Sequence, residues 1–261
     1  MMRSLWTAAT GMVAQQIEQD IVANNLANVN TVGFKKSRAD FQDLMYQIYA
    51  KSGAETSQGN QLPVGIEVGM GVKPISTQRM FLQGDYQQTG NQFDWAIEKD
   101  GFFQFDDNGE TYYGRAGNFK INRDGLIVNS EGLPLLPNIT IPTGTVSFTV
   151  DTGGTWTAAD QEGNPLATGR LELAIFLNPA GLTAIGRNLF AKSEASGEAI
   201  TGNPGEDGIG TISQNFLEMS NVNVIDEMVR MIVGQRAYEI NSKAIQTADA
   251  MLGIIAALKR S

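Results

Sequence analysis

Apolar residues follow a helical spacing near the N-terminus of the chain. They step by three and four along one face of a helix, at Trp6, Ala9, Val13 and Ile17. Residues 4–30 contain one glycine and no proline, and Gly33 then provides a stop signal. The pattern predicts a helix that ends shortly before Gly33.

The C-terminal end has a longer pattern, with an apolar residue at every seventh position. The stripe runs through Val224, Met231, Tyr238, Ile245 and Leu252. Asn223 suits the N-cap of a helix, and Asp226 and Glu227 add negative charge to its first turn. We predict a helix over about 224–257, which would be ~50 Å long.

Two packing arrangements are open for this C-terminal helix. The positions four residues beyond the stripe do not form a leucine seam, since they hold Met228, Gln235, Ser242, Asp249 and Ala256. The helix could pack on its own domain as an ordinary amphipathic element. The two end helices could instead pair with each other or with copies from neighbouring molecules. We favour pairing, because two long thin stripes exceed what one compact β domain can cover.

The middle of the chain is typical of antiparallel β structure. Short apolar or aromatic runs occur at 101–105, 111–115, 119–122, 126–128, 146–150, 171–177 and 211–217. Tight-turn sequences separate the first of them, Asp107-Asn108-Gly109 and Arg123-Asp124-Gly125. Residues 50–62 contain almost no large apolar side chain and indicate a linker or an extended arm.

Composition narrows the chemistry available to this protein. The chain has 261 residues, no Cys and no His, and a formal net charge of -9. Thiolate and imidazole catalysis and zinc sites built from those ligands are therefore excluded. Nucleic acid is an unsuitable partner for so acidic a chain. We expect no cofactor, no metal, no cleaved secretory signal and no direct insertion into a membrane.

Two stretches of the sequence contain acidic residues that could bind calcium or catalyse hydrolysis. Asp106-Asp107-Asn108-Gly109-Glu110 resembles the start of a calcium loop, but its glycine and later glutamate are misplaced, so we predict a hairpin turn. Asp94, Glu98 and Asp100 lie near aromatic residues and could serve a carboxylate-based hydrolase of the cell wall. A strand with solvated charges explains them more simply. No catalytic constellation emerges, and we predict that the chain is not an enzyme.

Three stretches together resemble the flagellar axial family of rod, hook and hook-associated proteins. Residues 23–35 (Ala-Asn-Asn-Leu-Ala-Asn-Val-Asn-Thr-Val-Gly-Phe-Lys) are similar to the N-terminal signature of that family. Residues 220–243, from Ser220-Asn221-Val222-Asn223 onwards, are similar to its C-terminal signature. The hairpin series from Gly101 to Leu133 resembles the shared β domain. The polar arm and residues 62–72 resemble the distal-rod members more than the proximal-rod or hook members, which stay as alternatives.

The resemblance implies an α+β fold in four parts. Long N- and C-terminal helices would form a coiled-coil-like rod domain from residues 1–45 and 218–261. An extended polar arm would occupy 46–65, and a mainly antiparallel β domain 66–217. The implied function is a structural subunit that assembles into a helical polymer in the basal body. Proximal rod proteins, the hook protein and surrounding ring proteins would be its partners, with export by the flagellar route.

The contacts of such a polymer should lie on the two end helices. A subunit with a separate contact face at each end forms heterologous contacts, and these generate open helical polymers. Amides in the N-terminal segment could fix register by hydrogen bonding across helices. The predicted polymerisation interface comprises Leu5, Ala9, Met12, Asn24, Asn25, Asn28, Val224, Met231, Tyr238, Ile245 and Leu252.

Overall fold

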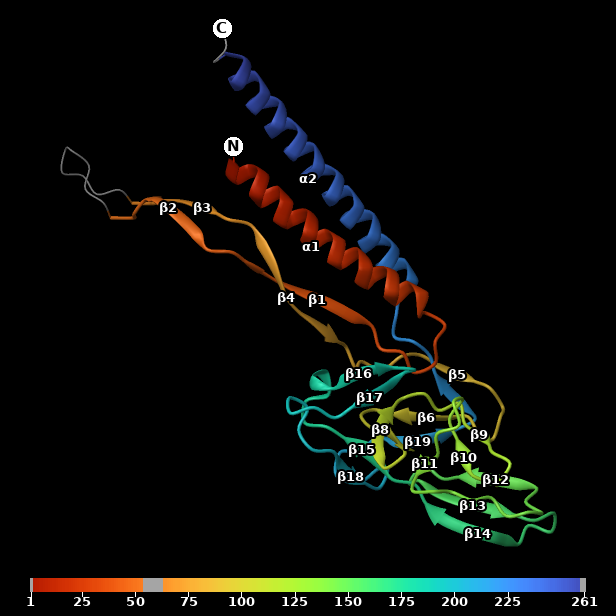
Figure 1. Ribbon diagram of the computed structural model, residues 1–261. Coiled ribbons are helices and arrows are strands. Elements are labelled where there is room, and N and C mark those ends of the chain that lie inside the picture. The colour runs from red at the N-terminus through yellow and green to blue at the C-terminus, as the bar shows by residue number, and fades with distance from the viewer. Residues whose placement is uncertain (1, 54–62, 259–261) are drawn as a thin grey trace. The chain divides into compact units, whose positions relative to one another are not determined.

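The structure, a computed structural model, describes residues 2–53 and 63–258 (Figure 1). The chain divides into two compact units, and it passes from one to the other four times. The helical unit comprises residues 1–26, 37–78 and 223–261. The β unit comprises residues 27–36 and 79–222.

Two antiparallel helices dominate the helical unit. The predicted helices are confirmed as α1 (Met2–Ala27) and α2 (Val224–Leu258). The predicted N-cap of α2 is also confirmed, because the Asn223 side-chain oxygen accepts the Ile225 N–H at 3.0 Å. The helices approach closely at glycines. A Cβ added at Gly11 would lie 2.9 Å from the Asn241 side chain, and one at Gly234 would lie 3.3 Å from Gln15.

The residues of α2 that face α1 form their own line at intervals of seven. They are Glu227, Gly234, Asn241 and Ala248, small or polar positions that the apolar pattern did not single out. The predicted stripe lies beside this seam, four residues further along from each member. Met231, Ile245 and Leu252 are half-buried there, whereas Tyr238 is 42% exposed. The helices therefore meet through small side chains and amides, with the predicted stripe along one edge.

A long two-stranded ribbon completes the helical unit. Strand β1 (Ser37–Asp43) pairs with β4 (Val72–Arg79), and β2 (Tyr46–Ala50) pairs antiparallel with β3 (Ile66–Gly69). The predicted domain boundaries at 45/46 and 65/66 fall inside this ribbon. The 54–62 portion of the predicted arm lies outside the described residues.

The ribbon lies along α1, and a glycine allows the close approach (Figure 1). The Thr10 hydroxyl accepts the Val72 N–H at 3.4 Å. Gly71 has a φ of 113°, and a Cβ there would come within 2.1 Å of the same hydroxyl oxygen. Only glycine combines that conformation with that space.

The β unit holds the remaining strands in small antiparallel sheets, as predicted for the middle of the chain. A five-stranded sheet has the order β11-β7-β8-β17-β16, and a three-stranded sheet has the order β12-β13-β14. Two-stranded pairs are β10-β9, β15-β18, β19-β6 and β20-β5. The bounds are β5 Tyr86–Gln88, β6 Trp95–Glu98, β7 Phe103–Asp107, β8 Glu110–Gly114, β9 Lys120–Ile121, β10 Ile127–Val128, β11 Leu135–Leu136, β12 Ser147–Val150, β13 Thr155–Ala159, β14 Pro165–Arg170, β15 Leu173–Ile175, the 3-10 helix η1 Pro179–Gly181, β16 Thr183–Gly186, β17 Leu189–Ala191, β18 Ile200–Gly202, β19 Thr211–Gln214 and β20 Phe216–Glu218.

The acidic turn at 106–110 is a hairpin, not a calcium loop. It joins β7 to β8, with Asp107 paired to Glu110 across the turn. Asn108 and Gly109 have φ values of 55° and 94°, as a tight hairpin turn requires. The Asp106 carboxylate accepts the Gly109 N–H at 3.1 Å, so it stabilises the turn itself.

An aromatic core holds the sheets of the β unit together. The fully buried Trp95 lies 4.8 Å from Phe119 and 5.8 Å from Phe148, ring centroid to centroid, and Phe148 stacks in turn on Trp156. Burial of such rings dominates the energetics of a core.

Candidate functional site

Three charged side chains are buried together in the β unit. The Lys35 ammonium donates to Glu218 Oε1 at 2.6 Å, and Arg115 Nε donates to Glu218 Oε2 at 2.9 Å. Lys35 and Glu218 are wholly buried, and Arg115 is nearly so. The remaining donors are also satisfied. Lys35 bonds to the Leu82 carbonyl, and Arg115 Nη1 bonds to the carbonyls of Lys99 and Gly101. We call Lys35, Arg115 and Glu218 the ionic cluster.

The ionic cluster keeps its carboxylate charged. Burial alone would raise the pKa of Glu218, but the charges of Arg115 and Lys35 and their hydrogen bonds outweigh it and hold that pKa below its ordinary value. Burial and the neighbouring Arg115 charge lower the pKa of Lys35, against the opposing effect of Glu218. Glu218 therefore compensates both cations, and the two cations together keep the carboxylate charged.

Further hydrogen bonds join the chain segments that contain Lys35 and Glu218. The Gly33 N–H donates to the Glu218 carbonyl at 2.8 Å, and the Lys36 N–H donates to Asn221 Oδ1 at 2.8 Å. The Asn221 amide also donates to the carbonyls of Met80 and Leu82. Gly33 has a φ of 69° and no room for a Cβ beside Arg115. Residues 33–36 and 218–221, each of which overlaps one family signature, are therefore fixed side by side within the β unit.

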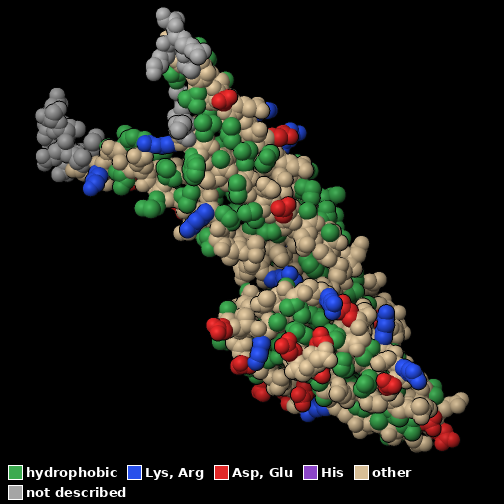
Figure 2. Space-filling model, in the orientation of Figure 1, with side chains coloured by type: hydrophobic (Ala, Val, Ile, Leu, Met, Phe, Trp, Pro, Cys, Tyr) green, Lys and Arg blue, Asp and Glu red, His purple; other side chains and the backbone are tan. Residues whose placement is uncertain are grey.

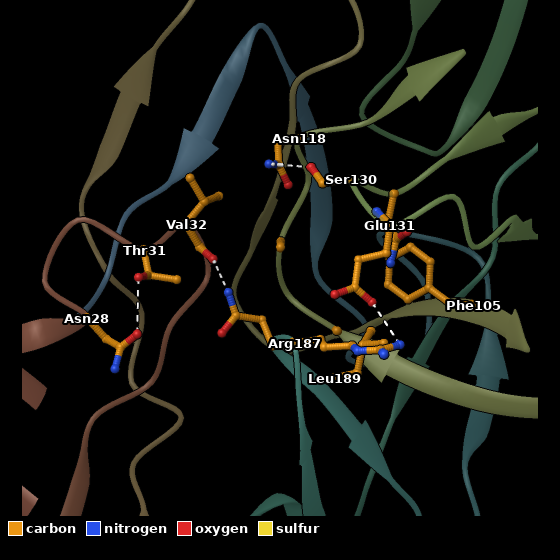
Figure 3. Close-up of a pocket in the computed structure, with 13 residues that line it drawn as sticks. Asn28, Thr31, Val32, Phe105, Asn118, Ser130, Glu131, Arg187 and Leu189 are labelled. Atoms are coloured by element: carbon orange, nitrogen blue, oxygen red, sulfur yellow. Dashed lines mark hydrogen bonds and ion pairs between the residues drawn. The ribbon is translucent and has the colours of Figure 1, made fainter. Parts of the chain in front are cut away.

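A polar cleft of about 410 Å³ lies beside this junction in the β unit (Figure 3). Its polar side chains bond to one another. Asn118 donates to the Ser130 hydroxyl at 3.1 Å, Thr31 donates to Asn28 Oδ1 at 3.2 Å, and Arg187 pairs with Glu131 at 3.3 Å (Figure 3). The Asn188 amide donates to the Val32 carbonyl at 3.3 Å, and this bond joins the 28–32 loop to the turn between β16 and β17. The cleft thus stabilises the loop rather than arranging reactive groups.

A single amide connects the elements of the helical unit. The Asn25 side chain accepts the Ser37 N–H and donates to the Ser37 carbonyl, both at 2.9 Å. It also donates to Glu227 Oε2 at 3.2 Å, which links α1 to α2. Asn25 and Glu227 are each 1% exposed. The predicted hydrogen bonding of this amide across helices therefore occurs within one chain.

The helical unit leaves much apolar surface uncovered (Figure 2). On α2, Ile225 is 71% exposed and Ile232 is 59% exposed. The ribbon exposes Tyr46, Ile48, Tyr49, Ile66 and Ile75. An apolar groove of about 400 Å³ lies between α1 and the ribbon, with walls formed by Trp6, Ala9, Val13, Leu44, Val72 and Pro74. Contiguous exposed apolar surface of this kind marks an interaction site.

In the structure, the predicted interface residues lie in several different environments. Leu5, Ala9 and Met12 are half-buried on α1, and Asn24 is exposed there. Asn28 belongs to the β unit and its oxygen accepts from Thr31. Val224 is exposed, as is Tyr238. Their role in contacts with other chains stays a prediction, except that the Asn25 amide already has its partners inside the subunit.

The hydrolase alternative requires exposed aromatic rings to bind a sugar, and two of the rings in question are buried. Trp95 and Phe103 are wholly buried in the core, so neither can stack on a sugar. Glu98 accepts the hydroxyls of Ser213 and Thr211, and Asp94 accepts the Asn91 amide. Among residues 2–53 and 63–258, no group of three His, Cys, Asp or Glu side chains could hold a metal ion. Within the same ranges, no helix is long and apolar enough to cross a membrane.

Paired end helices, a ribbon with bare apolar faces and a folded β unit are typical of a structural protein that contacts other chains. Three family models match the chain. "Flagella basal body rod protein" covers residues 5–35, "Flagellar hook protein FlgE/F/G D1 domain" covers 96–158, and "Flagellar basal body rod FlgEFG protein C-terminal" covers 213–258.

Similar proteins extend the match over the whole chain. It is 50% identical over 264 residues to flagellar basal-body rod protein FlgG of Borreliella burgdorferi, with 100% of both chains covered. It is 45% identical over 254 residues to the protein of that name from Caulobacter vibrioides, covering 96% of this chain and 97% of the relative. It is 30% identical to flagellar hook-basal body complex protein FlhP of Bacillus subtilis, with 98% of both chains covered. The chain belongs to the flagellar basal-body rod protein family and is a structural subunit of the rod.

Sequence reasoning did not find the ionic cluster. Lys35 and Glu218 lie 183 residues apart, and Arg115 directly follows β8. Neither the heptad spacing nor the turn signals bear on these residues. A charged residue at the end of an apolar stretch, as at Lys35 after Val32-Gly33-Phe34, was the one available sign.

Proposed function

We propose that this chain builds the distal rod, self-assembling into a rigid helical tube that transmits motor torque to the hook. The bare apolar surface of the helical unit carries the proposal. A monomer gains nothing from exposing Ile225, Ile232 and the apolar groove, whereas burial between subunits stabilises a polymer by about 25 cal/mol for each Å² removed from water.

In this proposal, the two units differ in how much their folding depends on neighbouring subunits. The β unit has a continuous aromatic core and satisfied internal charges, so it folds without a partner. The helical unit has a thin seam of small residues and amides, so its order depends more on neighbours. Rod subunits of this kind stack on proximal rod proteins, contact the hook protein and pass through surrounding ring proteins. The chain acts through these contacts rather than as an enzyme, and reaches the basal body by flagellar export without a cleaved signal.

The predicted stripe supplies the test of self-assembly. Ile245→Asp and Tyr238→Asp each place a charge beside the helix seam, where burial between subunits would make it costly by several kcal/mol, about 2–5. We expect loss of polymerisation and motility with an unchanged β unit. Gln246→Asp, at an exposed polar position of α2, is the matched control. Normal rods built by either stripe variant would contradict the proposal.

A further inference from the structure

The outer face of α2 carries an apolar ridge that residues 2–53 and 63–258 of its own chain leave uncovered. Ile225, Val229 and Ile232 lie two residues from the seam positions Glu227 and Gly234. At about 100° per residue, two residues place them roughly 200° around the helix from α1. All three are more than half exposed. We call Ile225, Val229 and Ile232 the ridge.

The apolar groove lies on the other side of the helical unit, between α1 and the ribbon. Trp6 is 63% exposed at one end of it, and Val13 is 53% exposed further along α1. The ridge of a given chain faces away from α1 and so cannot fill its own groove. Ridge and groove are two different surfaces, and each is large enough and apolar enough to need covering.

The charges beside the two surfaces are opposite. Lys73 lines the groove, and Asp226 adjoins the ridge. Within the described part of the chain, neither side chain makes an ion pair. Opposite charges at the margin of apolar surfaces fix the register of a contact more than its strength.

We propose that the ridge of one copy of this chain docks in the groove of the next copy. The contact is heterologous, because each copy offers a different surface at each side, and repetition therefore extends a helical polymer instead of closing a dimer. The Asp226 carboxylate of one copy then lies beside the Lys73 ammonium of its neighbour. This proposal rests on the proposed self-assembly, and it specifies the two surfaces through which neighbouring copies meet.

The absence of Cys from the sequence makes a cross-linking test direct. Val13→Cys and Val229→Cys are introduced into separate chains, which are mixed, assembled and oxidised. We expect disulfide-linked dimers in the assembled mixture and none from either variant alone. Val13→Cys mixed with Gln235→Cys, which is exposed on a different face of α2, is the control and should not cross-link.

The outcomes separate this contact from self-assembly itself. If wild-type chains fail to polymerise, the proposed function fails and the contact with it. If polymers form without a Val13–Val229 disulfide, polymerisation stands and the ridge-to-groove contact is wrong. Disulfides between two Val13→Cys chains would indicate an isologous contact and would also overturn it.

Charge reversal provides an independent measurement of register. Lys73→Glu and Asp226→Lys should each raise the critical concentration for polymerisation about two- to fivefold, in line with an exposed ion pair. The double variant should return to the wild-type value. A double variant as poor as the sum of the single variants would contradict the pairing.

Discussion

The Lys35 ammonium and the Glu218 carboxylate lie 2.6 Å apart, wholly buried, and 183 residues apart in the sequence. Arg115, the residue after β8, completes the cluster. Such a cluster is neutral or mildly costly when intact and strongly destabilising when one member is lost. Its effect here is to make folding of the β unit depend on both distant segments.

Glu218→Gln should destabilise the β unit by about 3–5 kcal/mol, because it leaves Lys35 and Arg115 buried without a counter-charge. Urea unfolding followed by tryptophan fluorescence measures this, since Trp95 and Trp156 lie in the β-unit core. Glu194→Gln, at an exposed position, is the matched control and should change stability by less than about 0.5 kcal/mol. Equal stability of the two variants would show that the cluster does not matter.

The Glu218 carboxylate should also make the stability of the β unit depend on pH in the acid range. The pKa of Glu218 is lower in the folded chain than in the unfolded chain, so its contribution is fully present above the unfolded value and is lost as pH falls through the folded one. We expect the free energy of unfolding of the β unit to fall below about pH 5, with a smaller slope in Glu218→Gln. Identical pH profiles for the two proteins would contradict this assignment.

Asn25→Ala should loosen the helical unit selectively. The substitution leaves the Ser37 backbone groups and the buried Glu227 carboxylate without their amide partner, at a cost of about 1–3 kcal/mol for each unsatisfied group. Hydrogen exchange should increase along α1 and β1 and stay unchanged in the β unit. Gln16→Ala, an exposed position on α1, is the control. Unchanged exchange in Asn25→Ala would rule out this role of the amide.

The sequence patterns predicted the positions of the two helices correctly. They did not predict which residues pack between the helices. The heptad from Val224 to Leu252 was conspicuous because its members are large and apolar. The seam uses Glu227, Gly234 and Ala248 instead, because helices approach most closely where side chains are small. Hydrophobic spacing cannot reveal a seam of that composition. The predicted β middle was confirmed because turn residues such as Asn108-Gly109 act locally.

The ribbon shows a second limit of the sequence. Residues 46–65 were expected to form a polar arm, whereas β1 to β4 pair across the range 37–79. Tyr46, Ile48 and Ile66 are apolar but exposed, so their hydrophobicity does not distinguish a core strand from an exposed ribbon. Long-range pairing decides that difference. The ionic cluster escaped prediction for the same reason.

Deleting Lys51 to Gln61 should leave the helical polymer assembled but flexible or curved. If this segment bridges neighbouring subunits, it resists compression on one side of the tube, and its loss removes that resistance. Electron microscopy of the assembled polymer measures its curvature. Replacing the same residues with an equally long Gly-Ser segment separates the effect of sequence from that of length. Straight, stiff polymers from the deletion variant would remove the basis for a stiffening role.

Assembly of the purified full chain tests the central claim most directly. Sedimentation across a range of concentrations, with electron microscopy of the pellet, measures whether the chain polymerises and in what form. We expect a critical concentration above which straight tubes of helical symmetry form, with the exposed apolar faces of the helical unit buried between copies. A chain that stays monomeric at all concentrations, or closes into a dimer or ring, would contradict it.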